Sequence, residues 1–346
     1  MKKSYFAAAN TGNGFVSLFD DIFSPRSLSH LYIIKGGPGT GKSTLMRSIA
    51  EKASEKGLEV EYYYCSADTD SLDGIKILPL GVAVIDGTAP HTKDPRYPGA
   101  VDTIIDLGEH FKTEKLIKNR ENIIELTDRC SAYYASAKRF LHAAGEMERA
   151  KRETALSAFD GAKAKRAAMR MLGRACAEKG NISERYISAL GVHGKCRLDT
   201  AENEAKRTIK VTGRYGFPML FLDVMAQAVR ELGLSAQRYP FVLSRERTEA
   251  IMVGNTLFAV YDEEVGDDGD IVNTYRFVDR EALALVRSKL RFTEKCVSAL
   301  VDGALESLCK MGKAHDELES YYIFAMDFEK NEKTKNKLIS EIFGGL

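Results

Sequence analysis

A glycine-rich segment near the amino terminus has the residue types and spacing of a phosphate-binding loop. Residues 36–44 read Gly-Gly-Pro-Gly-Thr-Gly-Lys-Ser-Thr and fit the pattern G-x-x-x-x-G-K-[ST]. Glycines let backbone N–H groups wrap closely around phosphate oxygens, and the start of a following helix adds partial positive charge there. We expect Lys42 to bridge the β- and γ-phosphates of a nucleotide, Ser43 to bind Mg²⁺, and Thr44 to hold the α-phosphate side. The nucleotide-binding residues predicted in this loop are Gly37, Pro38, Gly39, Thr40, Gly41, Lys42, Ser43 and Thr44.

A carboxylate at the end of an apolar run is the second candidate for metal binding. Asp86 follows four apolar residues, so it should stand at the carboxyl end of a buried strand, beside the phosphate loop. We expect Asp86 to hold Mg²⁺ through a water molecule and to take part in catalysis with Lys42. Gly87 follows, where many P-loop ATPases of the strand-inserted class carry a catalytic glutamate. The group that activates the attacking water or acceptor must therefore come from elsewhere.

Two further stretches should lie beside the phosphates. Asp68 or Asp70, after the second predicted strand, would accept the proton of an acceptor hydroxyl, although both residues equally fit a helix-capping loop. Thr88 or His91, after the third strand, would sense the γ-phosphate, although His91 also fits a surface position before a proline-rich loop. The sequence contains no guanine-reading motif, so ATP is the expected nucleotide.

The elements that must position these residues follow from the hydrophobic pattern. Short apolar runs at 31–34, 58–64 and 81–86 predict strands, and apolar residues at helical spacing predict a helix over 43–56. This alternation is typical of an α/β fold, here a P-loop NTPase-type parallel sheet with covering helices. Glycine and proline become rare from residue 100 to 179, which indicates two to four long helices.

The chain contains a weak internal repeat. With an offset of 176 residues, nine identities fall within the 37 positions from 50 to 86, among them Gly57 with Gly233 and Asp86 with Asp262. The repeat predicts a P-loop NTPase domain with a helical extension over 1–165, and a degenerate P-loop-like domain with carboxyl-terminal helices over 180–346. The alternative is a second half of unrelated fold. The same offset places Phe217, Pro218 and Met219 where the first half has Gly41, Lys42 and Ser43, so we expect no nucleotide in the second half.

Composition limits the classes of partner. The formal net charge is +1, which argues against a whole-protein attraction to nucleic acid or membrane. Residues 149–179 are locally basic, and a solvated helix face is favoured over a nucleic-acid surface. No apolar run approaches the roughly 20 residues that span a bilayer. The six cysteines are scattered, which is typical of free thiols, and we expect a cytoplasmic protein.

The first half is similar to a family of uncharacterised bacterial ATPases found chiefly in Firmicutes. The similarity covers residues 4 to about 145 and extends more weakly to the end. It implies a duplicated P-loop domain and ATP binding, but members keep a phosphate loop in both halves, and this chain departs from them at 217–219. The segments that carry the resemblance are 5–11, Gly14-Phe15, the phosphate loop, Ser71-Leu72-Asp73-Gly74 and 86–91.

Three functions are compatible with these features. The first is a Mg²⁺-dependent ATPase whose cellular role the sequence does not indicate. The second is a kinase that transfers the γ-phosphate to a small molecule or nucleotide. The third is a nucleotide-sensing scaffold without turnover. ATP is the expected partner in all three, a small-molecule acceptor only in the second, and the sequence does not indicate an oligomeric state.

Overall fold

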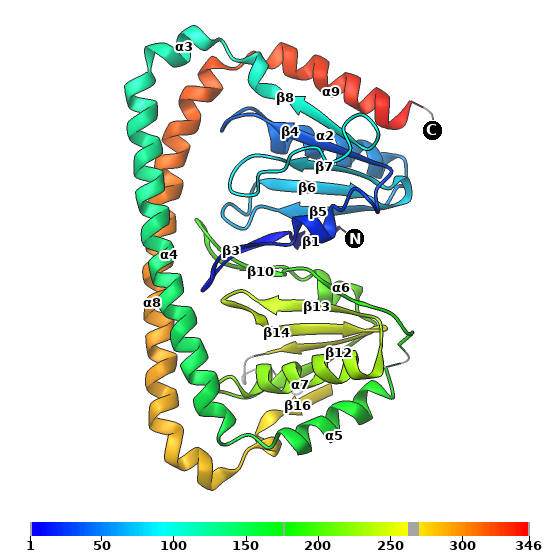
Figure 1. The fold of residues 1–346 in the computed structure, drawn as a ribbon, viewed down its shortest axis with the longest axis vertical. Coiled ribbons are helices and arrows are strands. Elements are labelled where there is room, and N and C mark those ends of the chain that lie inside the picture. Colours follow the sequence, from blue (N-terminus) through cyan, green and yellow to red (C-terminus); the bar gives the residue numbers. More distant parts are fainter. Residues whose placement is uncertain (1, 176, 262–269, 345–346) are drawn as a thin grey trace.

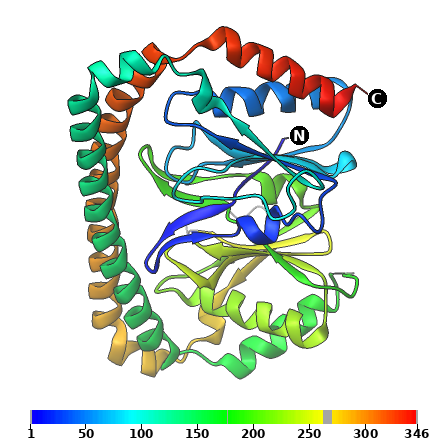
Figure 2. The same ribbon diagram turned by 45° about the horizontal axis from the view of Figure 1, so that its top comes forward.

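The protein consists of two six-stranded sheets that lie one above the other beside a long pair of helices (Figure 1). The computed structural model describes residues 2–175, 177–261 and 270–344. Strands and helices both contribute to each half, which confirms the α/β class predicted from the sequence. A second view shows that the helix pair runs along one side of both sheets (Figure 2).

The first sheet is mixed rather than all parallel. Its strands, in spatial order, are β1 (Lys3–Phe6), β5 (Val60–Tyr64), β6 (Leu72–Ile77), β7 (Val82–Asp86), β4 (His30–Lys35) and β8 (Asp102–Asp106). Strand β4 is parallel to β7 and β8, whereas β6 is antiparallel to both of its neighbours. The connections on either side of β6, residues 65–71 and 78–81, are too short for a parallel crossover, which needs about a dozen residues. The prediction of an all-parallel sheet is therefore wrong at β6.

The second sheet repeats the order of the first. Its strands, in spatial order, are β9 (Ile182–Glu184), β13 (Ala236–Phe241), β14 (Ser244–Val253), β15 (Thr256–Val260), β12 (Arg207–Thr212) and β16 (Asp270–Asn273). The strand directions also correspond, because β14 alone is antiparallel to both neighbours and β12 is parallel to β15 and β16. Asp262, which the sequence repeat aligns with Asp86, lies outside the described residues.

Helices and hairpins complete each half in the same order. The segment 100–179, predicted as helices alone, opens with strand β8 and a short 3₁₀ helix, and its α-helices begin only at residue 113. The longer helices are α2 (Lys42–Glu55), α4 (Arg120–Leu156), α5 (Gly161–Leu172), α7 (Phe217–Leu232), α8 (Arg280–Ala325) and α9 (Phe328–Phe343). The short helices are α1 (Phe19–Ile22), α3 (Thr113–Lys118), α6 (Thr200–Glu204), η1 (Leu78–Leu80), η2 (Leu107–His110) and η3 (Thr274–Phe277). Two hairpins form separate two-stranded sheets in the described part of the chain: β2 (Ala8–Thr11) with β3 (Gly14–Ser17), and β10 (Ser188–Gly191) with β11 (Gly194–Arg197).

The two halves exchange their covering helices. Helix α4 runs from the first half to the second, and α8 packs along it on the way back (Figure 1). Leu338 and Phe343 of α9 share an apolar core with Leu45 of α2, although α9 ends the chain. Ala164 of α5 likewise shares a core with Phe221 of α7. The carboxyl-terminal helix therefore helps α2 to cover one face of the first sheet.

Candidate functional site

The glycine-rich loop connects the central strand β4 to helix α2. Gly39 and Gly41 have φ angles of 65° and 82°, a left-handed conformation that glycine adopts without a steric penalty. Gly41 immediately precedes α2, and among the described residues no side chain caps the start of this helix. The first N–H groups of a helix have no partner within the helix and carry partial positive charge. This end of α2 can therefore accept an anion.

Lys42 and Asp86 converge at this loop. The Lys42 ammonium group donates to the carbonyl oxygens of Gly37 at 2.8 Å and Gly36 at 3.3 Å, and its Nζ lies 3.6 Å from Asp86 Oδ2. The other carboxylate oxygen of Asp86 accepts from Thr88, from the backbone N–H at 2.8 Å and from the hydroxyl at 2.6 Å. Parallel pairing of β4 with β7 brings the carboxyl ends of both strands to this edge. The structure thus brings together three of the predicted site residues.

Ser43 and Thr40 face different partners. The Ser43 hydroxyl accepts from the backbone N–H of Leu72 at 3.1 Å, so it lies against the start of strand β6. The buried Thr40 hydroxyl donates to the carbonyl oxygen of Gly37 at 2.9 Å and closes the loop on itself. Only the first of these hydroxyls stands at the start of α2, as the sequence motif requires of a metal ligand.

A buried carboxylic acid that the sequence did not single out as a site residue stands next to this centre. Asp73 on β6 is 5% exposed, and burial together with the nearby Asp86 carboxylate raises its pKa to about 8. Its Oδ1 lies 3.8 Å from Nε2 of His91. The stretch 68–73 is predicted to lie beside the phosphates, but with Asp68 or Asp70 as its functional carboxylate, because a charged residue inside a strand gives no local signal of a site.

His91 is buried, so its alternative interpretation as a surface residue is wrong. Its side chain is 5% exposed and its ring stacks on Phe19 with a centroid distance of 4.5 Å. Burial lowers the pKa of the imidazole, which favours the neutral ring. Neither ring nitrogen has a hydrogen-bond partner among the described residues. Buried polar atoms are normally paired, so these nitrogens are available to a ligand.

Asp68 and Asp70 lie on the exposed loop between β5 and β6. Asp68 accepts from the Ser71 hydroxyl at 2.6 Å and from the backbone N–H of Asp70 at 3.2 Å, and the Asp70 carbonyl oxygen accepts from Arg47. No hydrogen bond or ion pair within the described part of the chain joins either carboxylate to Lys42 or Asp86. Both instead contact His193 of the second half.

Helices from the end of the chain form the outer wall of the loop. Asn331 of α9 donates to the Thr40 carbonyl oxygen at 2.8 Å, and its side-chain oxygen lies 2.6 Å from His110 Nδ1. A Cβ at Gly39 would lie 2.7 Å from Ile323 of α8, so a larger residue there would collide with the wall. These contacts span nearly the whole sequence, and no local pattern predicts them.

Gly87 leaves no room for the glutamate that many P-loop ATPases of the strand-inserted class carry after the strand-end aspartate. A Cβ at this position would lie 2.4 Å from the Cγ2 atom of Ile33 on the neighbouring strand β4. Real Cβ contacts are never so close, so a side chain at residue 87 would force the strands apart. The expectation that another residue must activate the attacking group thus has a steric basis.

The corresponding loop of the second half is shorter by two residues. Gly213 and Gly216 have φ angles of 140° and 79°, like Gly36 and Gly41 with 152° and 82°, but the intervening residues number two instead of four. Gly216 precedes α7 as Gly41 precedes α2, so Phe217 takes the position of the loop lysine. The ungapped sequence repeat aligned Gly41, Lys42 and Ser43 with residues one position further along the second half than the structure does, because it did not allow for the shorter loop. In the structure Gly41, Lys42 and Ser43 correspond to Gly216, Phe217 and Pro218.

Side chains of the protein itself contact this second loop. The backbone N–H of Tyr215 donates to Glu294 at 3.2 Å. A Cβ at Gly216 would lie 3.6 Å from the side chain of Lys151, which is buried and paired with Glu148 at 2.6 Å. A carboxylate of α8 and a lysine of α4 thus lie beside the second loop.

The basic stretch 149–179 is partly neutralised by ion pairs. Lys151 is buried against Glu148, and Lys165 lies 2.7 Å from Glu231 of α7. These pairs reduce the positive charge that the stretch could present to a nucleic acid. None of the described helices is long and apolar enough to cross a membrane.

Comparison with known proteins gives one partial match. The family model of the nephrocystin 3 amino-terminal region matches residues 14–78, which include the glycine-rich loop and α2. Nephrocystin 3 is eukaryotic, so the match lends no support to the bacterial family that the sequence resembles. No curated protein and no solved structure matches the chain significantly.

Proposed function

We propose that the chain binds Mg-ATP at residues 36–44 and hydrolyses it, as a P-loop NTPase. The convergence of Lys42 and Asp86, with 3.6 Å between their charged atoms at the uncapped start of α2, is the main support. A lysine and a carboxylate at a helix N-terminus are the parts that cradle phosphates and hold their metal ion. The resemblance to uncharacterised bacterial ATPases agrees with this nucleotide.

Each residue of the centre has a distinct role in this proposal. Phosphate oxygens replace the carbonyl oxygens of Gly36 and Gly37 as acceptors for Lys42, because an anionic acceptor attracts the ammonium group more strongly than a neutral carbonyl oxygen does. The Ser43 hydroxyl and the Asp86 carboxylate would hold Mg²⁺, which prefers oxygen ligands. When bound, Mg²⁺ would neutralise charge on the phosphates.

We assign the activation of the attacking water to Asp73. A carboxyl group whose pKa is about 8 exchanges a proton readily at neutral pH, as a general base must. His91, with two unpaired ring nitrogens, would donate to the terminal phosphate. In this assignment Asp73 replaces Asp68 and Asp70 as the proton acceptor, because Asp73 is buried beside Asp86 and His91, whereas the side chains of Asp68 and Asp70 are exposed and contact His193.

Transfer of the phosphate to a small molecule is the second candidate. The exposed loop with Asp68 and Asp70 supports it, because an acceptor can approach there. A nucleotide-sensing scaffold is the third candidate, and the steric block at Gly87 supports it. A cytoplasmic location is part of the proposal, since all five described cysteines are free thiols.

Phosphate release from Mg-ATP by the full-length protein tests the proposal. We expect release without any acceptor, a loss of about 10²-fold or more in Asp73→Asn, and little change in the matched variant Asp68→Asn. Loss of activity in Asp68→Asn alone would refute the assignment of the base. Turnover that needs an added acceptor would favour a kinase, and tight binding of ATP without turnover would favour a scaffold.

A further inference from the structure

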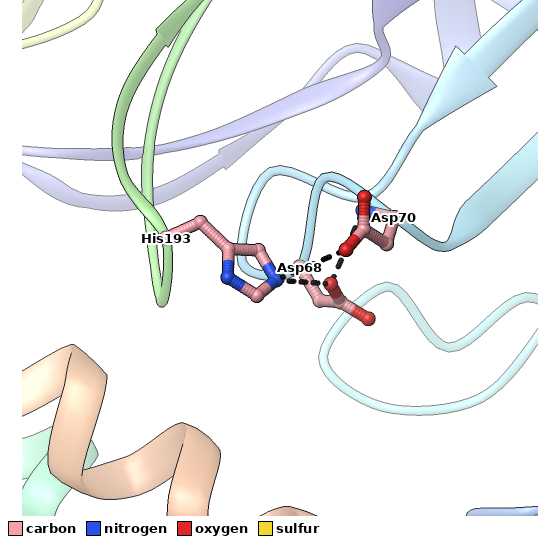
Figure 3. Close-up of side chains that lie close together, drawn as sticks. All are labelled: Asp68, Asp70 and His193. Carbon is pink, nitrogen blue, oxygen red and sulfur yellow. Dashed lines mark hydrogen bonds and ion pairs between the residues drawn. The ribbon is translucent and has the colours of Figure 1, made fainter.

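We propose that Asp68, Asp70 and His193 bind a divalent transition-metal ion where the two halves meet. The carboxylates come from the loop after β5 and the imidazole from the tip of the β10–β11 hairpin (Figure 3). The three ligand atoms lie within 4.8 Å of one another. This inference does not depend on the proposed nucleotide site, because the three residues are not bonded to that centre.

The hairpin that carries His193 is fixed against the first half. The backbone N–H of Val192 donates to the carbonyl oxygen of Ala67 at 2.8 Å. A Cβ at Gly191 would lie 2.6 Å from the same oxygen, so the close approach requires glycine. On the other side, the Asn10 amide donates to the carbonyl oxygen of Leu190 at 3.3 Å. His193 is therefore held at the carboxylates by the backbone around it.

The separations between the ligand atoms suit one shared ion. His193 Nε2 lies 3.2 Å from Asp68 Oδ1 and 3.4 Å from Asp70 Oδ2. Ligands bound at about 2.1 Å stand about 3.0 Å apart at neighbouring octahedral positions and about 3.4 Å apart at tetrahedral ones. The side chains of His193 and Asp70 are 56% and 87% exposed, which leaves the remaining positions open to water.

Residues outside the three ligands orient Asp68. The Ser71 hydroxyl donates to Asp68 Oδ2 at 2.6 Å and leaves Oδ1 facing the imidazole. Such second hydrogen bonds are typical of metal-binding carboxylates. One imidazole with two carboxylates suits Zn²⁺, Mn²⁺ or Co²⁺ better than Mg²⁺ or Ca²⁺, which prefer oxygen ligands alone.

Metal titration of the full-length protein tests the site. The protein is first freed of metal with a chelator and then titrated with Zn²⁺ by calorimetry, without nucleotide, and with Co²⁺ by visible absorption. We expect one equivalent of Zn²⁺, with affinity reduced at least tenfold in His193→Ala and in Asp68→Asn. The matched control is His315→Ala, since His315, Asp316 and Glu319 of α8 form the other group of potential ligands among the described residues.

The two histidine variants separate the possible outcomes. Zn²⁺ binding that survives in both His193→Ala and Asp68→Asn, or that disappears in His315→Ala, would overturn the proposal. So would the absence of any binding to the wild type, which would leave only a histidine-carboxylate ion pair. Far-UV circular dichroism without metal shows whether each variant is folded. If His193→Ala does not fold, Asp68→Asn still tests the site.

Discussion

Replacing the loop lysine tests the nucleotide site most directly. In the free protein the ammonium group of Lys42 donates to two carbonyl oxygens of the loop at 2.8 and 3.3 Å and lies 3.6 Å from Asp86. In the proposed complex, phosphate oxygens become its acceptors. The change Lys42→Met keeps most of the apolar stem and removes the charge and the donors.

The expected loss of affinity follows from these bonds. A hydrogen bond to a charged group contributes about 1.5–3 kcal/mol, so two lost bonds to phosphate amount to about 3–6 kcal/mol. Each 1.4 kcal/mol is a factor of about ten, so the Kd for Mg-ATP should rise about 10²- to 10⁴-fold. The free energy of unfolding should change by only about 1–2 kcal/mol, because the carbonyl bonds lost from Lys42 are partly offset by the removal of a half-buried charge. Calorimetry gives the first quantity and urea unfolding the second.

The matched control is Lys35→Met. Lys35 ends strand β4, and its ammonium group donates to the Gly87 carbonyl oxygen at 2.9 Å and pairs with Asp94. The charge change equals that of Lys42→Met, yet Lys35 has no role in the proposed site, so the Kd should stay within about threefold of the wild type. A folded Lys42→Met protein that binds Mg-ATP as the wild type does would refute the reasoning.

Other substitutions test the surroundings of the site. Burial raises the pKa of Asp73 to about 8, so between about pH 4 and 8 the folded state keeps a proton that the unfolded state has released. As the pH rises through this range, Asp73 should lower the free energy of unfolding by about 1.4 kcal/mol per pH unit. Asp73→Asn should remove that slope, which urea unfolding from pH 5 to 9 measures. Gly87→Glu should destabilise by about 1–3 kcal/mol in the same assay, whereas Gly161→Ala, with open space at its Cβ, should be neutral or stabilising. Asn331→Ala should cost about 1–2 kcal/mol of stability, because it removes the bond between α9 and the loop. Phe217→Lys should still bind one equivalent of ATP by calorimetry and should unfold more easily, because this position is fully buried.

The central strand, the following helix and the glycine-rich turn between them were predictable because their signals are local. The strand predicted at 31–34 corresponds to β4, and the helix predicted at 43–56 corresponds to α2 with both ends shifted by one residue. In each case an apolar period of a few residues determines the element, and the glycines mark the turn between them. The strand order of the second sheet matches that of the first, as the sequence repeat predicts, because the strands of both halves keep the same apolar pattern.

The remaining parts of the site depend on contacts that no local pattern records. Strand β6 contains Asp73 and Gly74, two residue types that are rare in strands, and so it was not predicted. Gly74 is required there because a Cβ would lie 2.8 Å from Phe23. The bond from Asn331 to the loop and the approach of His193 each join residues more than a hundred positions apart.

The exchange between the halves explains what the second half contributes to the glycine-rich loop of the first. The hairpin β10–β11 of the second half contacts the loop after β5, where the Val192 N–H donates to the Ala67 carbonyl oxygen. The hairpin β2–β3 of the first half contacts the second half in the same way, because the Gly12 N–H donates to the Leu243 carbonyl oxygen at 3.0 Å. Each half therefore holds one loop of the other. The second half holds the loop between β5 and β6, and the first half holds the loop between β13 and β14. Strand β6, which follows the first of these loops, contacts the start of α2 through the Leu72 N–H, which donates to the Ser43 hydroxyl. A ligand that moves this hydroxyl must strain the Leu72 contact or shift the start of β6 together with the loop that the second half holds. The second half therefore bears directly on the glycine-rich loop of the first.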